Sequence, residues 1–154
     1  MANEAALHMQ GQPTMIFIGV TTGKSAMMQV FPRWSEVWGL GAQLVGYDAP
    51  LHAPPEVYRA VVEHIKRDPM TYGGLVTTHK IDLVTACRDL FDELDPYAQL
   101  LGEVSSISKH DGKLIGHAKD PITSGLSWEA FVPPTHFRDH AVDVLCFGGG
   151  GAAG

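Results

Sequence analysis

The sequence lacks several features that would assign the protein to a specialised class. It has no apolar run long enough to cross a membrane, and its polar first residues contain no apolar signal core. No run of lysine and arginine exceeds two residues, and the net charge is −6, which argues against a nucleic-acid-binding surface. We therefore expect a cytoplasmic protein whose partner is a small molecule. Nothing in the sequence indicates its oligomeric state.

Cysteine is also scarce. The two cysteines, Cys87 and Cys146, fall in a helix-like and a strand-like apolar segment and form no CxxC pair. Such residues are typical of reduced core thiols in a cytosolic protein. We expect no metal site, because the sequence offers no set of ligands at the spacing that structural metal sites use.

Strand-like and helix-like segments alternate along the chain. The short apolar runs that predict buried strands lie at 14–21, 42–49, 72–78 and 141–147. The segments that predict helices lie at 26–40, where Pro32 should cause a kink or a new turn, and at 54–68, 80–94, 96–102 and 124–132. Residues 103–118 predict a hairpin that turns at Asp111-Gly112. This alternation predicts an α/β fold with three layers and a mainly parallel sheet.

The glycine-rich end of the sequence indicates a nucleotide site. Gly148, Gly150 and Ala153 follow the predicted strand 141–147 and satisfy G-x-G-x-x-G/A, whose glycines let the backbone approach a pyrophosphate. We interpret residues 1–13 as a disordered lead-in, 14–135 as a substrate-binding catalytic domain, and 136–154 as the start of a Rossmann-type cofactor domain. On this interpretation the chain is the front part of a larger enzyme, truncated at the first βα turn. The alternative is a flexible glycine tail.

Two motifs in the first half of the chain resemble those of the shikimate dehydrogenase family. "GVTTGKSAMM" is similar to the family's Ser-x-Ser-Pro segment, with Ser25 at the second serine. "LVTTHK" is similar to Asn-Val-Thr-x-Pro-x-Lys; it keeps Val76, Thr77 and Lys80 but is one residue shorter and lacks the proline.

Three further motifs follow in the family's order. "GEVSSI" places Ser105 where the family has an asparagine, and "DGKLIGHAKD" keeps the aspartate of the next motif as Asp120. "GGGGAA" is similar to the Gly-x-Gly-Gly-Ala that opens the family's cofactor domain. Together the motifs extend the resemblance from residue 15 to residue 154.

The resemblance implies an NAD(P)-dependent oxidoreductase that interconverts a cyclic or small hydroxy acid and its ketone, a reaction of aromatic amino acid biosynthesis. It implies that Lys80 and Asp120 transfer the proton. The substrate would be bound by Ser25, Thr77 and Ser105, and the NADP or NAD by Gly148, Gly150, Gly151 and Ala152.

The residues themselves leave other possibilities open. Lys80 lies at the start of a predicted helix, where the helix dipole disfavours an ammonium, which suits a lysine that gives up its proton. His79 is a second candidate base, since imidazole titrates near neutrality. Ser25 and Thr77 could instead cap helices.

Several substrate-contacting positions of the family are replaced. Gly23 stands in place of a serine, and Leu75 and Ala118 stand in place of asparagines. Because a site built around such partners loses affinity when they are missing, we expect shikimate itself to be a poor substrate. The alternatives are a non-catalytic binding or assembly domain that kept the fold, or a fragment that is inactive without its cofactor domain.

Overall fold

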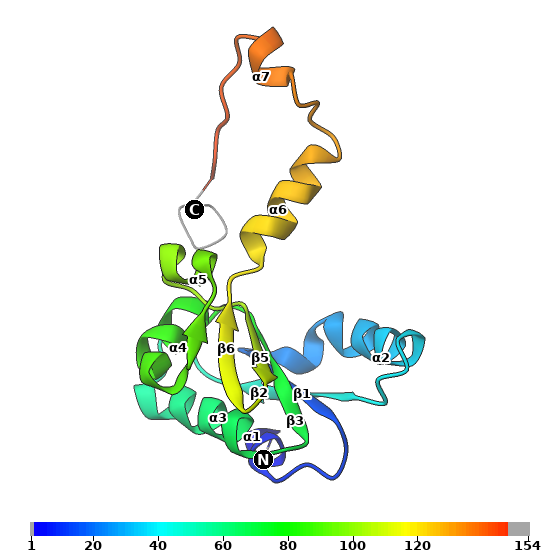
Figure 1. Cartoon of the computed structure of the whole chain (residues 1–154), viewed down its shortest axis with the longest axis vertical. Helices are drawn as coiled ribbons and strands as arrows, with labels where there is room; N and C mark the ends of the chain where they lie inside the picture. The colour runs from blue at the N-terminus through cyan, green and yellow to red at the C-terminus, as the bar shows by residue number, and fades with distance from the viewer. Residues whose placement is uncertain (1, 148–154) are drawn as a thin grey trace.

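The computed structural model describes residues 2–147, in which a six-stranded sheet has the order β2-β1-β3-β5-β6-β4 (Figure 1). The strands are β1 (Thr14–Gly19), β2 (Gln43–Asp48), β3 (Thr71–Val76), β4 (Glu93–Leu94), β5 (Ser106–His110) and β6 (Lys113–His117). The helices are α1 (Ala2–Leu7), α2 (Met27–Val37, with Pro32 inside it), α3 (Pro55–Arg67), α4 (Lys80–Cys87), α5 (Pro96–Leu101), α6 (Asp120–Glu129) and α7 (His136–Asp139), with 3₁₀ turns η1 (Thr22–Lys24) and η2 (Arg88–Leu90).

The sheet confirms the predicted α/β fold and is mixed in its strand directions. Strand β1 is parallel to β2 and β3, and β4 is parallel to β6. Strand β5 is antiparallel to both of its neighbours, β3 and β6. The predicted hairpin turns at Asp111 and Gly112, which have φ of 49° and 77°. Positive φ at both central residues is what a tight two-residue hairpin turn requires, and an Asp-Gly pair adopts it readily.

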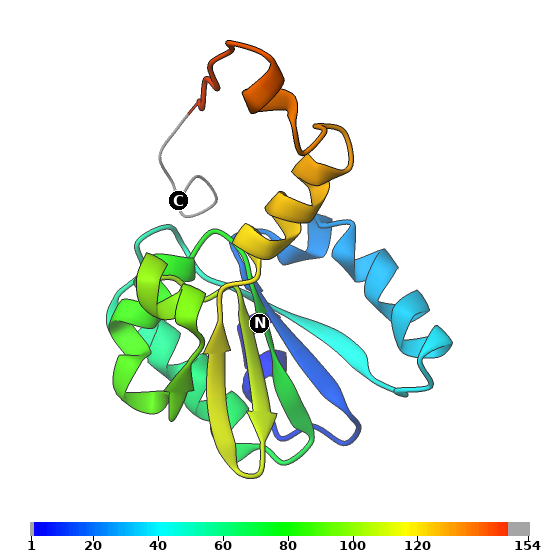
Figure 2. The same ribbon diagram turned by 45° about the horizontal axis from the view of Figure 1, so that its top comes forward.

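The two faces of the sheet have different coverings. Ile16 and Ile18 belong to the main core with Val61 and Ile65 of α3, and all four side chains are 0% exposed. The intervening Phe17 points to the opposite face, because successive side chains alternate along a strand. Helices α3, α4 and α5 cover the first face, and α2 lies against the second (Figure 2).

The three parallel strands place their carboxyl ends at one edge of the sheet. Strand β1 leads there into the turn 20–26, β2 into the loop 49–54, and β3 into the short segment before α4. In open α/β sheets this edge is where ligands bind. The fold therefore brings the polar residues after β1 and β3 together.

The prediction of a disordered lead-in over 1–13 is wrong for its first part. Residues 2–7 form α1, and Ala6 is 0% exposed in the core. The Asn3 amide nitrogen donates to the Asp48 carbonyl oxygen at 2.6 Å, and its oxygen accepts from the Asp48 N–H at 2.8 Å. This paired hydrogen bond anchors α1 to the edge strand β2, which the polar composition of the segment did not indicate.

The helix predicted over 80–94 ends early. Helix α4 stops at Cys87, and the chain then joins the sheet as β4. The Asp92 N–H donates to the Leu114 carbonyl oxygen at 2.9 Å, and the Asp92 carboxylate accepts from the Leu114 N–H at 2.8 Å. Leu94 would be buried in a helix over 80–94 and is buried in β4, so the apolar pattern of the sequence could not distinguish the helix from the strand.

The strand predicted over 141–147 is also absent. These residues lie in neither a helix nor a strand, and Leu145 and Phe147 are 76% and 92% exposed. An isolated strand is not stable without a neighbour, and within residues 2–147 none pairs with this segment. Cys146 is accordingly exposed, contrary to the prediction, whereas Cys87 is buried as predicted.

Helix α6 begins at Asp120, four residues before its predicted start, with Pro121 in its first turn. Helices α6 and α7 extend away from the sheet (Figure 1). Across residues 2–147, no helix has the length and apolar character needed to cross a lipid bilayer.

Candidate active site

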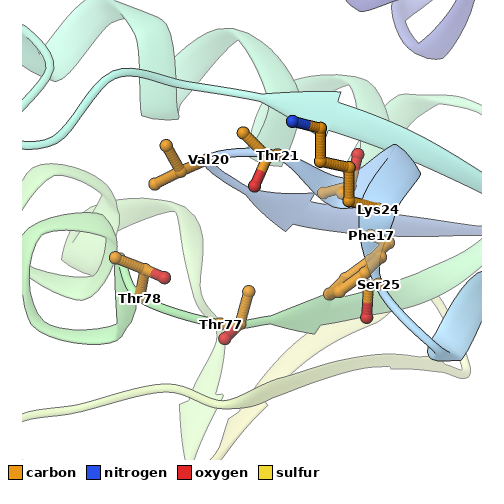
Figure 3. Close-up of a pocket in the computed structure, with 8 residues that line it drawn as sticks. Phe17, Val20, Thr21, Lys24, Ser25, Thr77 and Thr78 are labelled. Carbon is orange, nitrogen blue, oxygen red and sulfur yellow. The ribbon is translucent and has the colours of Figure 1, made fainter.

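A pocket of about 270 Å³ opens at the carboxyl ends of β1 and β3. Figure 3 shows the turn after β1 on one side of this pocket and the end of β3 on the other. The lining residues are Phe17, Val20, Thr21, Thr22, Lys24, Ser25, Thr77 and Thr78. The pocket thus contains Ser25 and Thr77, two of the residues predicted to bind substrate.

The turn after β1 is clamped to the end of β2. The Asp48 carboxylate accepts hydrogen bonds from the Thr22 N–H at 2.8 Å and from the Thr22 hydroxyl at 2.7 Å. Gly46 makes room for this contact, since a Cβ there would lie 2.2 Å from the Thr22 hydroxyl oxygen. The clamp fixes the wall of the pocket that carries Lys24 and Ser25.

The polar groups of the pocket are mostly donors without protein partners. Within residues 2–147 the side chains of Thr21, Thr77, Thr78 and Lys24 make no hydrogen bond or ion pair to other residues. Ser25 Oγ accepts from the Met27 N–H at 3.2 Å, which leaves its O–H available. No aspartate or glutamate is among the described lining residues, so the pocket favours an anionic ligand that also bears hydroxyls.

Sequence reasoning missed Lys24, Thr21 and Thr78. The signal that could have found them is the polar run "TTGKS" directly after the buried strand β1. In a parallel sheet such a run lies at the edge where ligands bind.

Lys80 and Asp120 form an ion pair, with side chains 21% and 29% exposed. Each is the first residue of its helix, Lys80 of α4 and Asp120 of α6. The Lys80 carbonyl oxygen accepts from the Val104 N–H at 3.1 Å, which ties the start of α4 to the segment before β5. The pair is not part of the pocket lining: Lys80 lies two residues beyond Thr78, the last lining residue of the β3 wall.

Ser105 occupies a different place from the one predicted. It is 4% exposed and does not line the pocket. Its hydroxyl oxygen accepts from the Lys119 N–H at 2.8 Å, and its O–H donates to the His117 carbonyl oxygen at 3.4 Å. The serine thus fixes the segment that leads into Asp120.

His79 is equally enclosed, at 1% exposed. Its Nε2 lies 3.1 Å from the Ala49 carbonyl oxygen and its Nδ1 lies 3.2 Å from the Tyr58 hydroxyl oxygen. Both ring nitrogens are occupied, which leaves neither for a substrate proton. Thr78 before it has φ of 49°. Proline, fixed near −65°, could not adopt this conformation, which fits the missing proline of this motif.

A second group of charges lies beside the segment before Asp120. The Asp95 carboxylate accepts from the Ala98 N–H at 2.8 Å and from Lys119 Nζ at 3.3 Å, and it lies 3.4 Å from His117 Nδ1. Burial, assisted by Lys119, lowers the pKa of His117 below its ordinary value despite Asp95. The lowered pKa favours the neutral form of the His117 imidazole.

Two possible metal ligands lie close together at α7. His136, the first residue of α7, and His140, the residue after its end, have ring centroids 5.1 Å apart. Over residues 2–147 no group of three or more histidine, cysteine, aspartate or glutamate side chains is arranged to hold a metal ion. Gly148, Gly150, Gly151 and Ala152, predicted to bind the cofactor, lie outside the described residues.

Comparison with known proteins finds shikimate dehydrogenases among the relatives of this chain. No protein-family model matches the chain. A curated shikimate dehydrogenase (NADP(+)) of Exiguobacterium sp. is 32% identical over 136 residues, which are 88% of this chain and 47% of that protein. The enzyme of the same name from Lactococcus lactis subsp. cremoris is 32% identical over 94 residues, 61% of this chain and 30% of that protein.

Solved structures share the fold. A crystal structure of shikimate dehydrogenase in complex with NADP+ has a TM-score of 0.65 and 28% identity, covering 77% of this chain and 39% of that one. A ligand-free 5-ketofructose reductase of Gluconobacter sp. has a TM-score of 0.64 at 20% identity, covering 80% of this chain and 42% of that one, and shows the fold alone.

These matches agree with the motifs and with the sheet. The chain spans about half or less of the length of the curated relatives it matches. Its alignment with the shikimate dehydrogenase (NADP(+)) of Exiguobacterium sp. covers most of this chain, and its fold is that of a solved shikimate dehydrogenase. The chain is therefore similar to the shikimate dehydrogenases in both sequence and fold.

Proposed function

We propose that this chain is the substrate-binding part of an NAD(P)-dependent oxidoreductase acting on a small hydroxy acid, with Lys80 and Asp120 as its proton-transfer pair. The observation that carries the proposal is the ion pair between Lys80 and Asp120 beside the hydroxyl-lined pocket. The two residues reach this position on separate helices.

The pocket supplies recognition of the acid. Lys24 and the hydroxyls of Thr21, Ser25, Thr77 and Thr78 offer donors to a carboxylate and to a ligand hydroxyl. Charge-assisted hydrogen bonds from an ammonium are about twice as strong as neutral ones. A ligand held there extends past Thr78 toward Lys80, which places its reacting hydroxyl next to the amine.

The proton moves between that hydroxyl and the Lys80 amine. In the oxidation direction the neutral amine of Lys80 accepts the hydroxyl proton, and in reduction the ammonium returns it to the carbonyl oxygen. Asp120 orients the amine and stabilises its protonated form. A nicotinamide cofactor, when bound, supplies hydride transfer.

The replaced positions bear on which acid is bound. Gly23, Leu75 and Ala118 offer no side-chain hydrogen bond where the family has a serine and two asparagines. Each missing bond to an uncharged partner weakens binding by about 0.5–1.5 kcal/mol. The preferred ligand is therefore a hydroxy acid with fewer or differently placed hydroxyls than shikimate.

The proposal is tested by ligand binding and by turnover. Small hydroxy acids, shikimate among them, are titrated into the isotopically labelled 154-residue chain and followed by NMR. A ligand that shifts the Thr77, Thr78 and Lys80 signals is then assayed for oxidation with NADP or NAD in the protein that carries the cofactor domain. Binding without Lys80-dependent turnover would favour a non-catalytic binding domain.

A further inference from the structure

The junction between β3 and α4 holds a buried hydrogen-bonded pair that the proposed proton transfer does not use. Tyr58 on α3 and His79, the residue before Lys80, are each 1% exposed. The Tyr58 hydroxyl oxygen lies 3.2 Å from His79 Nδ1, and the two rings lie with centroids 5.4 Å apart. The other ring nitrogen of His79 lies 3.1 Å from the Ala49 carbonyl oxygen.

One protonation state satisfies every group in this network. The Ala49 carbonyl can only accept, so His79 Nε2 carries the proton and donates to it. Nδ1 is then an acceptor, and the Tyr58 O–H donates to it. The Tyr58 oxygen in turn accepts from the Ala53 N–H at 3.1 Å. The network is complete and ties the loop after β2, helix α3 and the residue before Lys80 into one unit.

The backbone conformation at Thr78 and His79 is unusual. Thr78 has φ of 49°, in the left-handed region that threonine rarely adopts, and His79 has φ of −90° and ψ of 16°. Such conformations persist only where the surrounding structure determines them. The His79 carbonyl oxygen accepts from the Leu83 N–H at 2.8 Å and so opens α4. The buried imidazole therefore sets the direction in which Lys80 leaves the backbone.

We propose that Tyr58 and His79 are positioning residues that hold Lys80 against Asp120. The inference deepens the proposed function and rests on it, since it is the proposed reacting group that they place. Removing the Tyr58 hydroxyl leaves His79 Nδ1 and the Ala53 N–H buried without partners, a costly arrangement that the imidazole relieves by moving. The backbone from Thr78 to Lys80 then relaxes, and the ion pair with Asp120 loosens.

The test measures how readily the Lys80 amine reacts in the 154-residue chain. Wild type, Tyr58→Phe, Tyr47→Phe and Asp120→Asn are labelled with trace acetic anhydride at about pH 7.5, where paired amines react slowly. Peptide mass spectrometry then gives the labelling rate of each lysine. Asp120→Asn defines the rate of an unpaired Lys80. Tyr47→Phe is the matched control, because Tyr47 is 3% exposed and its hydroxyl donates to the Val57 carbonyl oxygen at 2.9 Å without contacting His79.

In Tyr58→Phe we expect Lys80 to be labelled about fivefold faster than in wild type, approaching the Asp120→Asn rate. Tyr47→Phe should leave the labelling rate of Lys80 unchanged, even though it also removes a buried tyrosine hydroxyl and lowers Tm. A wild-type rate in Tyr58→Phe, or an equal rise in Tyr47→Phe, overturns the positioning role while leaving the proposed function intact. An Asp120→Asn rate equal to wild type would overturn the positioning role and also remove the main support for the proposed function.

Discussion

Lys80 and Asp120 are the first residues of two different helices, α4 and α6, and their side chains form an ion pair. Neither helix packs along the other; the pairing depends on the segments that precede them. The first segment is held by His79 and the second by Ser105. The Lys80–Asp120 ion pair therefore depends on buried hydrogen bonds in the segments that precede α4 and α6.

We expect Lys80→Met to abolish proton transfer while preserving binding. Methionine keeps much of the side-chain volume but removes the amine. Because a positioned acid or base contributes about 10²- to 10⁴-fold, kcat for the preferred hydroxy acid should fall at least 100-fold. Ligand affinity, measured by NMR titration, should change only a few-fold. Retention of full turnover by Lys80→Met would remove Lys80 from the mechanism.

Lys24 should decide whether the pocket prefers an acid to its neutral ester. A hydrogen bond to a charged group is worth about 1.5–3 kcal/mol, so Lys24→Met should weaken binding of the preferred hydroxy acid by about 10- to 100-fold and leave its methyl ester nearly unaffected. Lys24→Arg should keep the preference for the acid. The matched control is Lys113→Met, because Lys113 is exposed and paired with Glu93 at 2.6 Å, away from the pocket. Equal losses for acid and ester would contradict this role.

The sequence predicted those features that depend on neighbours in the chain. The Asp111-Gly112 turn and helix α3 are examples, because the positive φ of the turn and the apolar stripe of the helix are local properties. The pairing of Lys80 with Asp120 could be expected only from the family resemblance, since nothing near either residue specifies the other.

The failures share a different cause. The segment 141–147 has the composition of a strand but no strand to pair with in residues 2–147, and pairing is not a property of the segment itself. Lys24 was missed because the polar run after β1 was compared only with the family's serine motif, which has no lysine at this position. His79 is a candidate base by residue type, yet its burial between Tyr58 and Ala49 withdraws it from solvent.

The two cysteines should react very differently with thiol reagents. Burial raises the pKa of Cys87 to about 12, whereas Cys146 is exposed. Because the thiolate is the reactive form, a disulfide reagent such as DTNB should label Cys146 quickly and leave Cys87 protected at pH 8 or so. Unfolding in guanidinium should expose the Cys87 thiol to the reagent. Rapid labelling of Cys87 in the Cys146→Ser variant without denaturant would show that this part of the core opens readily.

Gly73 should tolerate no side chain. A Cβ at this position on β3 would lie 2.1 Å from the Ile107 carbonyl oxygen, which is backbone and cannot move without disturbing the ladder between β3 and β5. We expect Gly73→Ala to lower the free energy of unfolding by about 2–3 kcal/mol. Gly125→Ala is the control: nothing lies within 4 Å of its Cβ on α6, and alanine favours a helix by about 1 kcal/mol over glycine. Urea unfolding of both variants should therefore give shifts of opposite sign, and a stable Gly73→Ala would mean that β3 and β5 are not packed as described.

Asp68 should make stability depend on pH in the acid range. It is 0% exposed; burial alone would raise the pKa of its carboxyl, but hydrogen bonds from Thr71 and from the Gln10 and Met70 N–H groups lower that pKa below its ordinary value of 3.8. A carboxyl whose pKa is lower in the folded state than in the unfolded state stabilises the fold above the unfolded pKa. This contribution is lost as pH falls through the folded pKa. Asp68→Asn should therefore be less stable than wild type at pH 6 by about 2 kcal/mol or more, and the difference should narrow as pH falls below about 4. Urea unfolding of both proteins between these pH values measures the difference, and a gap that stays constant with pH would mean that the Asp68 carboxylate is not the stabilising form.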